Sequence, residues 1–267
     1  MGERFSECSA RSGRRSPGAS SRWAREWQLF SVLVLVLASG RVEAACVDPA
    51  TAAHSTVGIT RHFDGKEQEA RPGVLAVRGT GWFLAPTSVV TVEHVAAGMN
   101  LSDQDWKPVD FRQGETTQSI PARIQRVAGS SKERIAVLAL QTAPADAQGF
   151  ALRMEPLVPG EPLVSLAYPD SRLRVAGGRF VQYGDGDRLA GTALLELYDG
   201  NDRLVLDHGA SGAPVLDCAG RVVAVVSNLF TTTMQFMSRV IRVSTAWGSA
   251  NVLSVPVPVL KDFSRTE

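Results

Sequence analysis

The sequence predicts an all-β protein, because short strand-like runs follow one another along most of its length. Each run is apolar or alternates apolar with polar residues, and Gly, Pro, Asp or Ser separates it from the next. No long stretch of the sequence keeps the 3.6-residue period of a helix, so a β-sandwich or β-barrel is favoured. The predicted strands cover residues 74–77, 82–85, 88–91, 120–127, 135–140, 163–168, 179–183, 192–197, 221–227 and 252–257.

The composition is that of a globular protein with one large or two small cores. The chain has 267 residues, of which 44% are hydrophobic and 21% are charged. Residues 141–161 are the least strand-like part of the middle, since they contain Pro144, Pro156, Pro159 and Gly160. We therefore expect this segment to connect two β halves.

Residues 1–44 have the organisation of a secretory signal peptide. Arginines in the first 27 residues precede an uncharged run of 14 residues from Trp27 to Gly40. That run is shorter than the roughly 17–25 residues that span a bilayer, and the small residues around Ala44 suit cleavage. We expect export to the periplasm or the medium, with no stable membrane insertion after cleavage. An uncleaved membrane anchor is the alternative.

The chain that remains after this cleavage is nearly neutral and has two cysteines. It keeps 21 basic and 23 acidic side chains, a formal charge of −2, which does not indicate a nucleic-acid partner. Cys46 and Cys218 form an even pair in an exported chain, which predicts one disulfide. Two unpaired thiols are the alternative.

The segment Gly209-Ala210-Ser211-Gly212 presents a serine between glycines, directly before an apolar strand. Glycine permits turn conformations that a side chain forbids, so such a turn can hold a hydroxyl at the lip of a cleft. Ser211 is therefore a candidate nucleophile, and an ordinary turn is the alternative. Backbone N–H groups of Gly209 and Ser211 in this turn could point together at a developing oxyanion.

His94 is a candidate base for that nucleophile. It follows the apolar strand that ends near Val92 and precedes a segment of small residues, so its imidazole lies at a strand end. A histidine in this position is structural in many proteins. Paired with Ser211, however, it supplies the second member of a nucleophile–base pair.

Four blocks of the sequence, together and in this order, resemble the signature blocks of trypsin-like serine proteases. Their spacing is similar to that of the bacterial HtrA-type branch, over about residues 70–260 and without a PDZ domain. The resemblance implies two six-stranded antiparallel β-barrels with an active site between them. The blocks are Gly79-Thr80-Gly81-Trp82-Phe83, Val90-Thr91-Val92-Glu93-His94-Val95, Ile135-Ala136-Val137-Leu138 and Gly209-Ala210-Ser211-Gly212-Ala213-Pro214-Val215.

The resemblance also implies roles for individual residues. His94 becomes the general base and Ser211 the nucleophile of an exported endopeptidase that acts on peptides or proteins without a cofactor. Gly209, Ala210 and Ser211 become the oxyanion hole, and Ser227, Asn228 and Leu229 pair with the substrate backbone. The alternative is a weak or inactive homologue that binds peptides or proteins.

The third member of the triad departs from the family pattern. The family places an aspartate before the strand that begins at Ile135, and this chain has Arg134 there. A guanidinium repels the imidazolium that an acid stabilises. Glu93 could pair with Arg134 and also reach His94, or Glu133 could act as the acid while Arg134 turns to solvent. The third possibility is that neither carboxylate reaches His94.

These observations predict the organisation of the whole chain. No group of His, Cys, Asp and Glu has metal-ligand spacing above chance, so we expect no metal site. The sequence carries no indication of the oligomeric state. The expected parts are a signal peptide (1–44), an N-terminal extension (45–69), a first barrel (70–145), a connection (146–161), a second barrel (162–260) and a tail (261–267).

Overall fold

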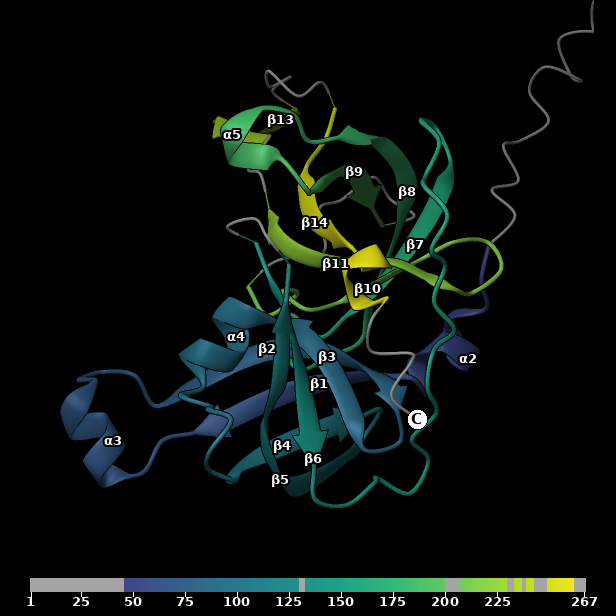
Figure 1. The fold of residues 1–267 in the computed structure, drawn as a ribbon. Coiled ribbons are helices and arrows are strands. Elements are labelled where there is room, and N and C mark those ends of the chain that lie inside the picture. The colour runs from purple at the N-terminus through teal and green to yellow at the C-terminus, as the bar shows by residue number, and fades with distance from the viewer. Residues whose placement is uncertain are drawn as a thin grey trace, which may run out of the picture. The chain divides into compact units, whose positions relative to one another are not determined.

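The structure, a computed structural model, contains two closed barrels of six antiparallel strands each. It describes residues 46–129, 133–199, 206, 208–229, 233–236, 239–242 and 249–261. Both barrels, with their short helices, are drawn in Figure 1. The all-β prediction and the prediction of two six-stranded antiparallel barrels are therefore confirmed. The expected signal peptide lies outside the described residues.

The first barrel has the strand order β1-β2-β3-β6-β5-β4, and pairing between β1 and β4 closes it. Figure 1 shows α4 beside this barrel. It contains β1 (Thr56–His62), β2 (Ala76–Ala85), β3 (Ser88–Val92), β4 (Lys107–Gln113), β5 (Thr116–Ala128) and β6 (Ile135–Leu140), with α2 (Pro49–Ala53), α3 (Gly65–Ala70) and α4 (Glu93–Gly98).

The second barrel has the strand order β10-β11-β14-β9-β8-β7. Two further short strands pair with each other in a separate antiparallel sheet. The barrel contains β7 (Pro162–Ala167), β8 (Arg174–Tyr183), β9 (Ala193–Tyr198), β10 (Pro214–Leu216), β11 (Val222–Leu229) and β14 (Val252–Pro256), with α5 (Gly186–Leu189) and the 3-10 helix η1 (Val257–Leu260); the small sheet is β12 (Thr233–Phe236) and β13 (Arg239–Arg242).

The segment expected to be an N-terminal extension, residues 45–69, contributes a strand to the first barrel. β1 pairs with β2 over its whole length, from Thr56↔Trp82 to His62↔Ala76. Val57 and Ile59 point into the core of the barrel, where both are fully buried. The first barrel therefore begins at Thr56 and not at residue 70.

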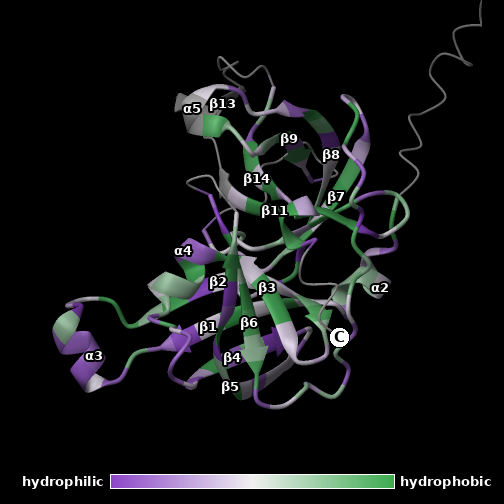
Figure 2. Ribbon diagram, viewed as in Figure 1, coloured by the Kyte–Doolittle hydropathy of each residue, from purple (hydrophilic) through white to green (hydrophobic). Residues whose placement is uncertain are grey.

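Buried apolar side chains fill both barrels. Trp82, Phe83 and Ile135 are among the fully buried residues of the first barrel, and Phe180 and Leu195 are buried in the second. In Figure 2 the strand β6 is mostly hydrophobic in colour, which agrees with the burial of almost all of Ile135–Leu140. Burial of this apolar area is the main favourable contribution to folding.

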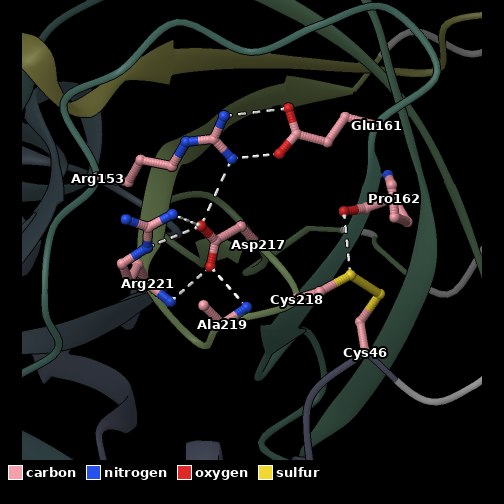
Figure 3. The surroundings of a disulfide bond; sticks show 8 residues. All are labelled: Cys46, Arg153, Glu161, Pro162, Asp217, Cys218, Ala219 and Arg221. Atoms are coloured by element: carbon pink, nitrogen blue, oxygen red, sulfur yellow. Dashed lines mark hydrogen bonds and ion pairs between the residues drawn. A yellow bond between two sulfur atoms is a disulfide. The ribbon is translucent and has the colours of Figure 1, made fainter.

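A disulfide and an ionic network stabilise one end of the β10–β11 hairpin (Figure 3). Cys46 is bonded to Cys218, the same pairing that the sequence analysis expects. The adjacent Asp217 is buried and accepts hydrogen bonds from the guanidinium of Arg221 at 2.7 and 2.9 Å. Arg153, from the segment between the barrels, lies 3.5 Å from the same carboxylate and also pairs with Glu161. The network therefore joins the connecting segment to the hairpin that follows Ser211.

Within the described part of the chain, no helix combines the length and the apolar character that a membrane crossing requires.

Candidate active site

The Ser211 turn has the backbone conformation that its glycines permit. Gly209 has φ +100° and Gly212 has φ +94°, values that residues with a side chain rarely adopt. A Cβ at Gly209 would lie 2.7 Å from the carbonyl oxygen of Pro169, and one at Gly212 would overlap that of Thr80. Both positions thus require glycine for two reasons, conformation and space.

Thr80 of β2 bonds the Ser211 turn to the first barrel. Its N–H donates to the carbonyl oxygen of Ser211 at 2.9 Å, and its hydroxyl donates to that of Gly209 at 2.7 Å. The same hydroxyl accepts a hydrogen bond of 3.0 Å from the N–H of Tyr168 in the second barrel. Three polar contacts at one buried residue therefore set the position of the turn between the two barrels.

β11 holds the other side of the turn. The N–H of Gly212 donates to the carbonyl oxygen of Val226 at 2.7 Å. The hydroxyl of Ser211 donates to the carbonyl oxygen of Ser227 at 2.9 Å. Ser211 is partly buried, and its hydroxyl lies where β2, β11 and the turn meet. The backbone of the expected substrate strand, Ser227 to Leu229, belongs to β11, although the side chains of Asn228 and Leu229 lie outside the described part.

His94 is the second residue of α4, so the imidazole that we expected at a strand end projects from the first turn of a helix. The preceding Glu93 N–H donates to the carbonyl oxygen of Arg134 at 2.8 Å, which fixes the start of α4 against the entry to β6. On the other side of His94, Val95 packs against Gly79 of β2. The start of α4 therefore lies beside the strand that bonds the Ser211 turn.

Partial burial and two carboxylates affect the ionisation of His94. Burial disfavours the imidazolium and lowers the pKa below its ordinary value of 6.5, while the charges of Glu133 and Glu93 act in the opposite direction. Burial dominates, so the net shift is downward. The side chain nevertheless keeps an exposed surface. At neutral pH the imidazole is therefore in the form that can accept a proton.

The two glutamates near His94 have different partners. Both carboxylate oxygens of Glu93 accept from Arg134, one of them from Nε at 2.6 Å. Glu133 accepts a hydrogen bond from the hydroxyl of Ser227, a fully buried residue. Ser227 thus contacts Glu133 through its hydroxyl and Ser211 through its carbonyl oxygen.

Neither Thr80 nor the hydroxyl of Ser227 was singled out by the sequence analysis, since a threonine or serine within a strand carries no distinctive signal.

The comparison with protein families identifies the family of this domain. Residues 79–225, more than half of the chain, match the family described as the trypsin-like peptidase domain. The chain belongs to the trypsin-like peptidase family. The match begins at Gly79, runs through His94 and Ser211, and ends within β11.

Solved structures share the chymotrypsin-like fold of this trypsin-like domain. The active form of the Rv3671c protease from M. tuberculosis has 18% identity and a TM-score of 0.53, over 80% of this chain and 81% of that chain. The inactive form of the same protease has 19% identity and a TM-score of 0.52, over 80% and 88%. Deg5 has 14% identity and a TM-score of 0.52, over 79% and 87%. The comparison with curated protein sequences finds no match.

The trypsin-like site has donors available for an oxyanion. The N–H groups of Gly209 and Ser211 have no acceptor among the described residues, whereas those of Gly212 and Ala213 are both used within the fold. Two free donors beside a serine hydroxyl suit a developing negative charge on a carbonyl oxygen. Among the described residues no group of three or more His, Cys, Asp and Glu is arranged to hold a metal ion.

Proposed function

We propose that this trypsin-like domain is a serine endopeptidase in which Ser211 is the nucleophile, His94 the general base and Glu133 the acid. The observation that carries the proposal is the position of Ser227, which contacts both Glu133 and Ser211. Glu133 also lies close enough to His94 for its charge to raise the imidazole pKa. In this proposal the nucleophile, the base and the acid come from three separate segments of the chain.

Glu93 is the less suitable acid, because both of its oxygens are engaged by Arg134. The pairing of Glu93 with Arg134 also affects the charge near His94. A guanidinium near His94 would oppose the imidazolium of the transition state, and its pairing with Glu93 neutralises that charge locally. The Glu93–Arg134 pair therefore compensates for the arginine at the position where the family resemblance expects an acid.

The reaction begins with rotation of the Ser211 hydroxyl from the carbonyl oxygen of Ser227 towards His94. The hydroxyl oxygen then attacks the carbonyl carbon of a peptide bond while the imidazole takes its proton. The N–H groups of Gly209 and Ser211 bind the oxyanion of the tetrahedral intermediate. His94 returns the proton to the leaving amine, and water, activated by the same imidazole, hydrolyses the acyl-enzyme.

Export is a further part of the proposal. The apolar run near the N-terminus has the length of a signal peptide, and the Cys46–Cys218 disulfide is of a kind that persists in oxidising compartments. We place the protein in the periplasm or outside the cell, acting on peptide or protein substrates. Mass measurement of the protein recovered from the periplasm or the medium tests whether residues 1–44 have been removed.

Labelling with a fluorophosphonate probe tests the nucleophile. We expect the wild-type protein to be labelled and Ser211→Ala to remain unlabelled, because the probe bonds to an activated serine oxygen. Glu133→Gln should slow labelling by about 10²- to 10⁴-fold, since loss of the acid removes the orientation of His94. Glu93→Gln should have a smaller effect.

Two outcomes would contradict this proposal. Equal labelling rates in both glutamine variants would remove Glu133 from the triad. Absence of labelling in folded wild-type protein would favour the non-catalytic peptide-binding alternative. Circular dichroism of each variant establishes that it is folded.

A further inference from the structure

One edge of β2 is only partly covered by other strands. β1 pairs with β2 from Ala76 to Trp82. On the opposite edge, β3 pairs only with the segment from Trp82 to Ala85. No other described strand pairs with Ala76–Gly81 on that edge. On this edge Thr80 is bonded to Ser211 and Thr91, and the part of β2 before Thr80 has no strand partner among the described residues, so it presents an open strand edge.

The register shows which backbone groups face the open edge. The N–H of Phe63 donates to the carbonyl oxygen of Leu75, so Leu75 and every second residue after it point their backbone groups at β1. The residues between them face away from β1. Thr80 is one of these, and its N–H reaches the carbonyl oxygen of Ser211. Arg78, two residues earlier, directs its own N–H and carbonyl oxygen at the same open edge.

Arg78 also places a charge at this edge. Its side chain is exposed, and among the described residues it has neither a hydrogen bond nor an ion pair. Gly79, the next residue, lies against Val95 of α4, with its Cβ position 3.3 Å from the carbonyl oxygen of Ser211. An exposed guanidinium thus lies on the strand that borders the nucleophile.

The direction of the substrate follows from the two sides of Ser211. β11 contacts the turn on one side, through Val226 and Ser227, and β2 contacts it on the other, through Thr80. A peptide whose acyl part pairs with Ser227–Leu229 must continue past Ser211 towards β2. Its leaving-group part then meets the open edge at Arg78.

We propose that Arg78 forms a carboxylate-binding subsite that selects Asp or Glu among the first three residues after the cleaved bond. The subsite rests on the proposed peptidase function and names a substrate class for it. The backbone of Arg78 holds the peptide in an extended conformation, and the guanidinium pairs with the acidic side chain. Because the pair is exposed to solvent, the expected preference is modest, about 3- to 5-fold in kcat/KM.

Internally quenched peptides that carry Glu, Gln or Lys at each of these three positions test the subsite. We expect wild-type protein at low salt to cleave the Glu peptides about 3- to 5-fold faster than the Gln peptides. Arg78→Gln should abolish this difference, and Arg78→Glu should reverse it in favour of Lys. About 1 M salt should weaken the wild-type preference, because the pair is screened. Arg123→Gln, which removes a partly buried guanidinium of the first barrel, is the control and should keep the preference for Glu peptides.

A binding measurement separates failure of the subsite from failure of the peptidase function. Fluorophosphonate labelling of Ser211 in the wild-type protein reports on the peptidase function alone. Fluorescence anisotropy with Ser211→Ala measures binding of the same Glu, Gln and Lys peptides without cleavage. Stronger binding of Glu peptides that depends on Arg78 supports the subsite even if the wild type cleaves nothing. Equal binding of the three peptide types at all three positions overturns it.

Discussion

Ser227 shows how a single buried residue can serve two parts of a site. It is fully buried, and burying a hydroxyl without a partner costs free energy. The carboxylate of Glu133 supplies that partner, so the requirement of the fold also sets the position of the acid. The carbonyl oxygen of the same residue receives the Ser211 hydroxyl. A serine at this point of β11 is thus explained by hydrogen bonding alone, before any catalytic argument.

The pH dependence of labelling should follow the ionisation of His94. Burial holds the imidazole pKa below 6.5, so the neutral base predominates at pH 7 and is lost only on acidification. We expect the labelling rate of the wild type to fall as the pH decreases through a midpoint below 6.5. In Glu93→Gln, loss of a negative charge that raises the pKa should move the midpoint to still lower pH. The measurement is the labelling rate over a pH series at constant ionic strength.

Glu115→Gln is the control for that experiment. Glu115 lies fully exposed after β4 and pairs only with Arg112 among the described residues, so its loss should leave the midpoint unchanged. A midpoint that moves upward in Glu93→Gln would contradict the electrostatic argument.

The sequence indicated which residues are candidates for the site but not which contacts they make. His94 and Ser211 could be chosen because glycine spacing and strand patterns mark their surroundings. The partners of Glu93, Glu133 and Arg134 could not be chosen, since two carboxylates and one guanidinium allow several pairings of similar free energy. The structure pairs Glu93 with Arg134 and Glu133 with Ser227. The burial of Ser227, a tertiary property, distinguishes these pairings.

At the scale of elements, the short helix α4 depends on side chains from outside it. Arg71, at the end of α3, donates to the carbonyl oxygen of Gly98 at 2.7 Å. Arg61 of β1 donates to that of Met99 at 3.0 Å, and Lys107 of β4 donates to that of Asn100 at 2.6 Å. A six-residue helix is not stable by itself, so these contacts at its C-terminal end help to hold His94 in place.

Replacement of Arg71 by Ala should therefore slow labelling at Ser211, although Arg71 lies on another element. We expect a decrease on the order of tenfold, because small displacements of a catalytic base are costly. Arg71→Lys should restore part of the rate, since lysine can also donate to the Gly98 carbonyl oxygen. Labelling kinetics at several probe concentrations provide the measurement. The rate in Arg174→Ala, a surface variant of β8 that loses an ion pair with Asp170, should stay unchanged.

Element prediction succeeded where strands are apolar and failed where polar residues are structural. β6 was predicted with its observed bounds, because nearly every side chain in Ile135–Leu140 is buried. β1 and β4 were missed. β1 contains a buried Arg61 that pairs with Glu67, and β4 contains Pro108 and several polar residues. Alternation of apolar and polar residues does not reveal a strand whose buried positions include an arginine.

At the scale of the whole molecule, the Cys46–Cys218 disulfide closes a covalent loop with a sequence separation of 172. It joins the segment before β1 to the β10–β11 hairpin, and so connects the two barrels. Loops of this length lose much conformational entropy in the unfolded state when they are closed. The disulfide therefore stabilises the association of the barrels.

Removal of the disulfide should lower the free energy of unfolding by about 2–5 kcal/mol. The double variant Cys46→Ser/Cys218→Ser is compared with the wild type by urea denaturation, and reduced wild-type protein should behave like the variant. Labelling of Ser211 below the unfolding transition should be retained, since the bond lies outside the proposed site. An unchanged unfolding free energy would show that the network of Asp217, Arg153 and Arg221 suffices.

The hydrogen bonds of Thr80 have a consequence for the order in which the protein is made. Thr80 and His94 belong to the first barrel, whereas the turn that they complete follows more than one hundred residues later. His94 is therefore synthesised long before Ser211. No partial chain that ends before Ser211 can contain both. The proposed activity can therefore appear only after the second barrel has been synthesised and has folded against the first. The cell that makes the enzyme thus contains no active protease while the chain is incomplete.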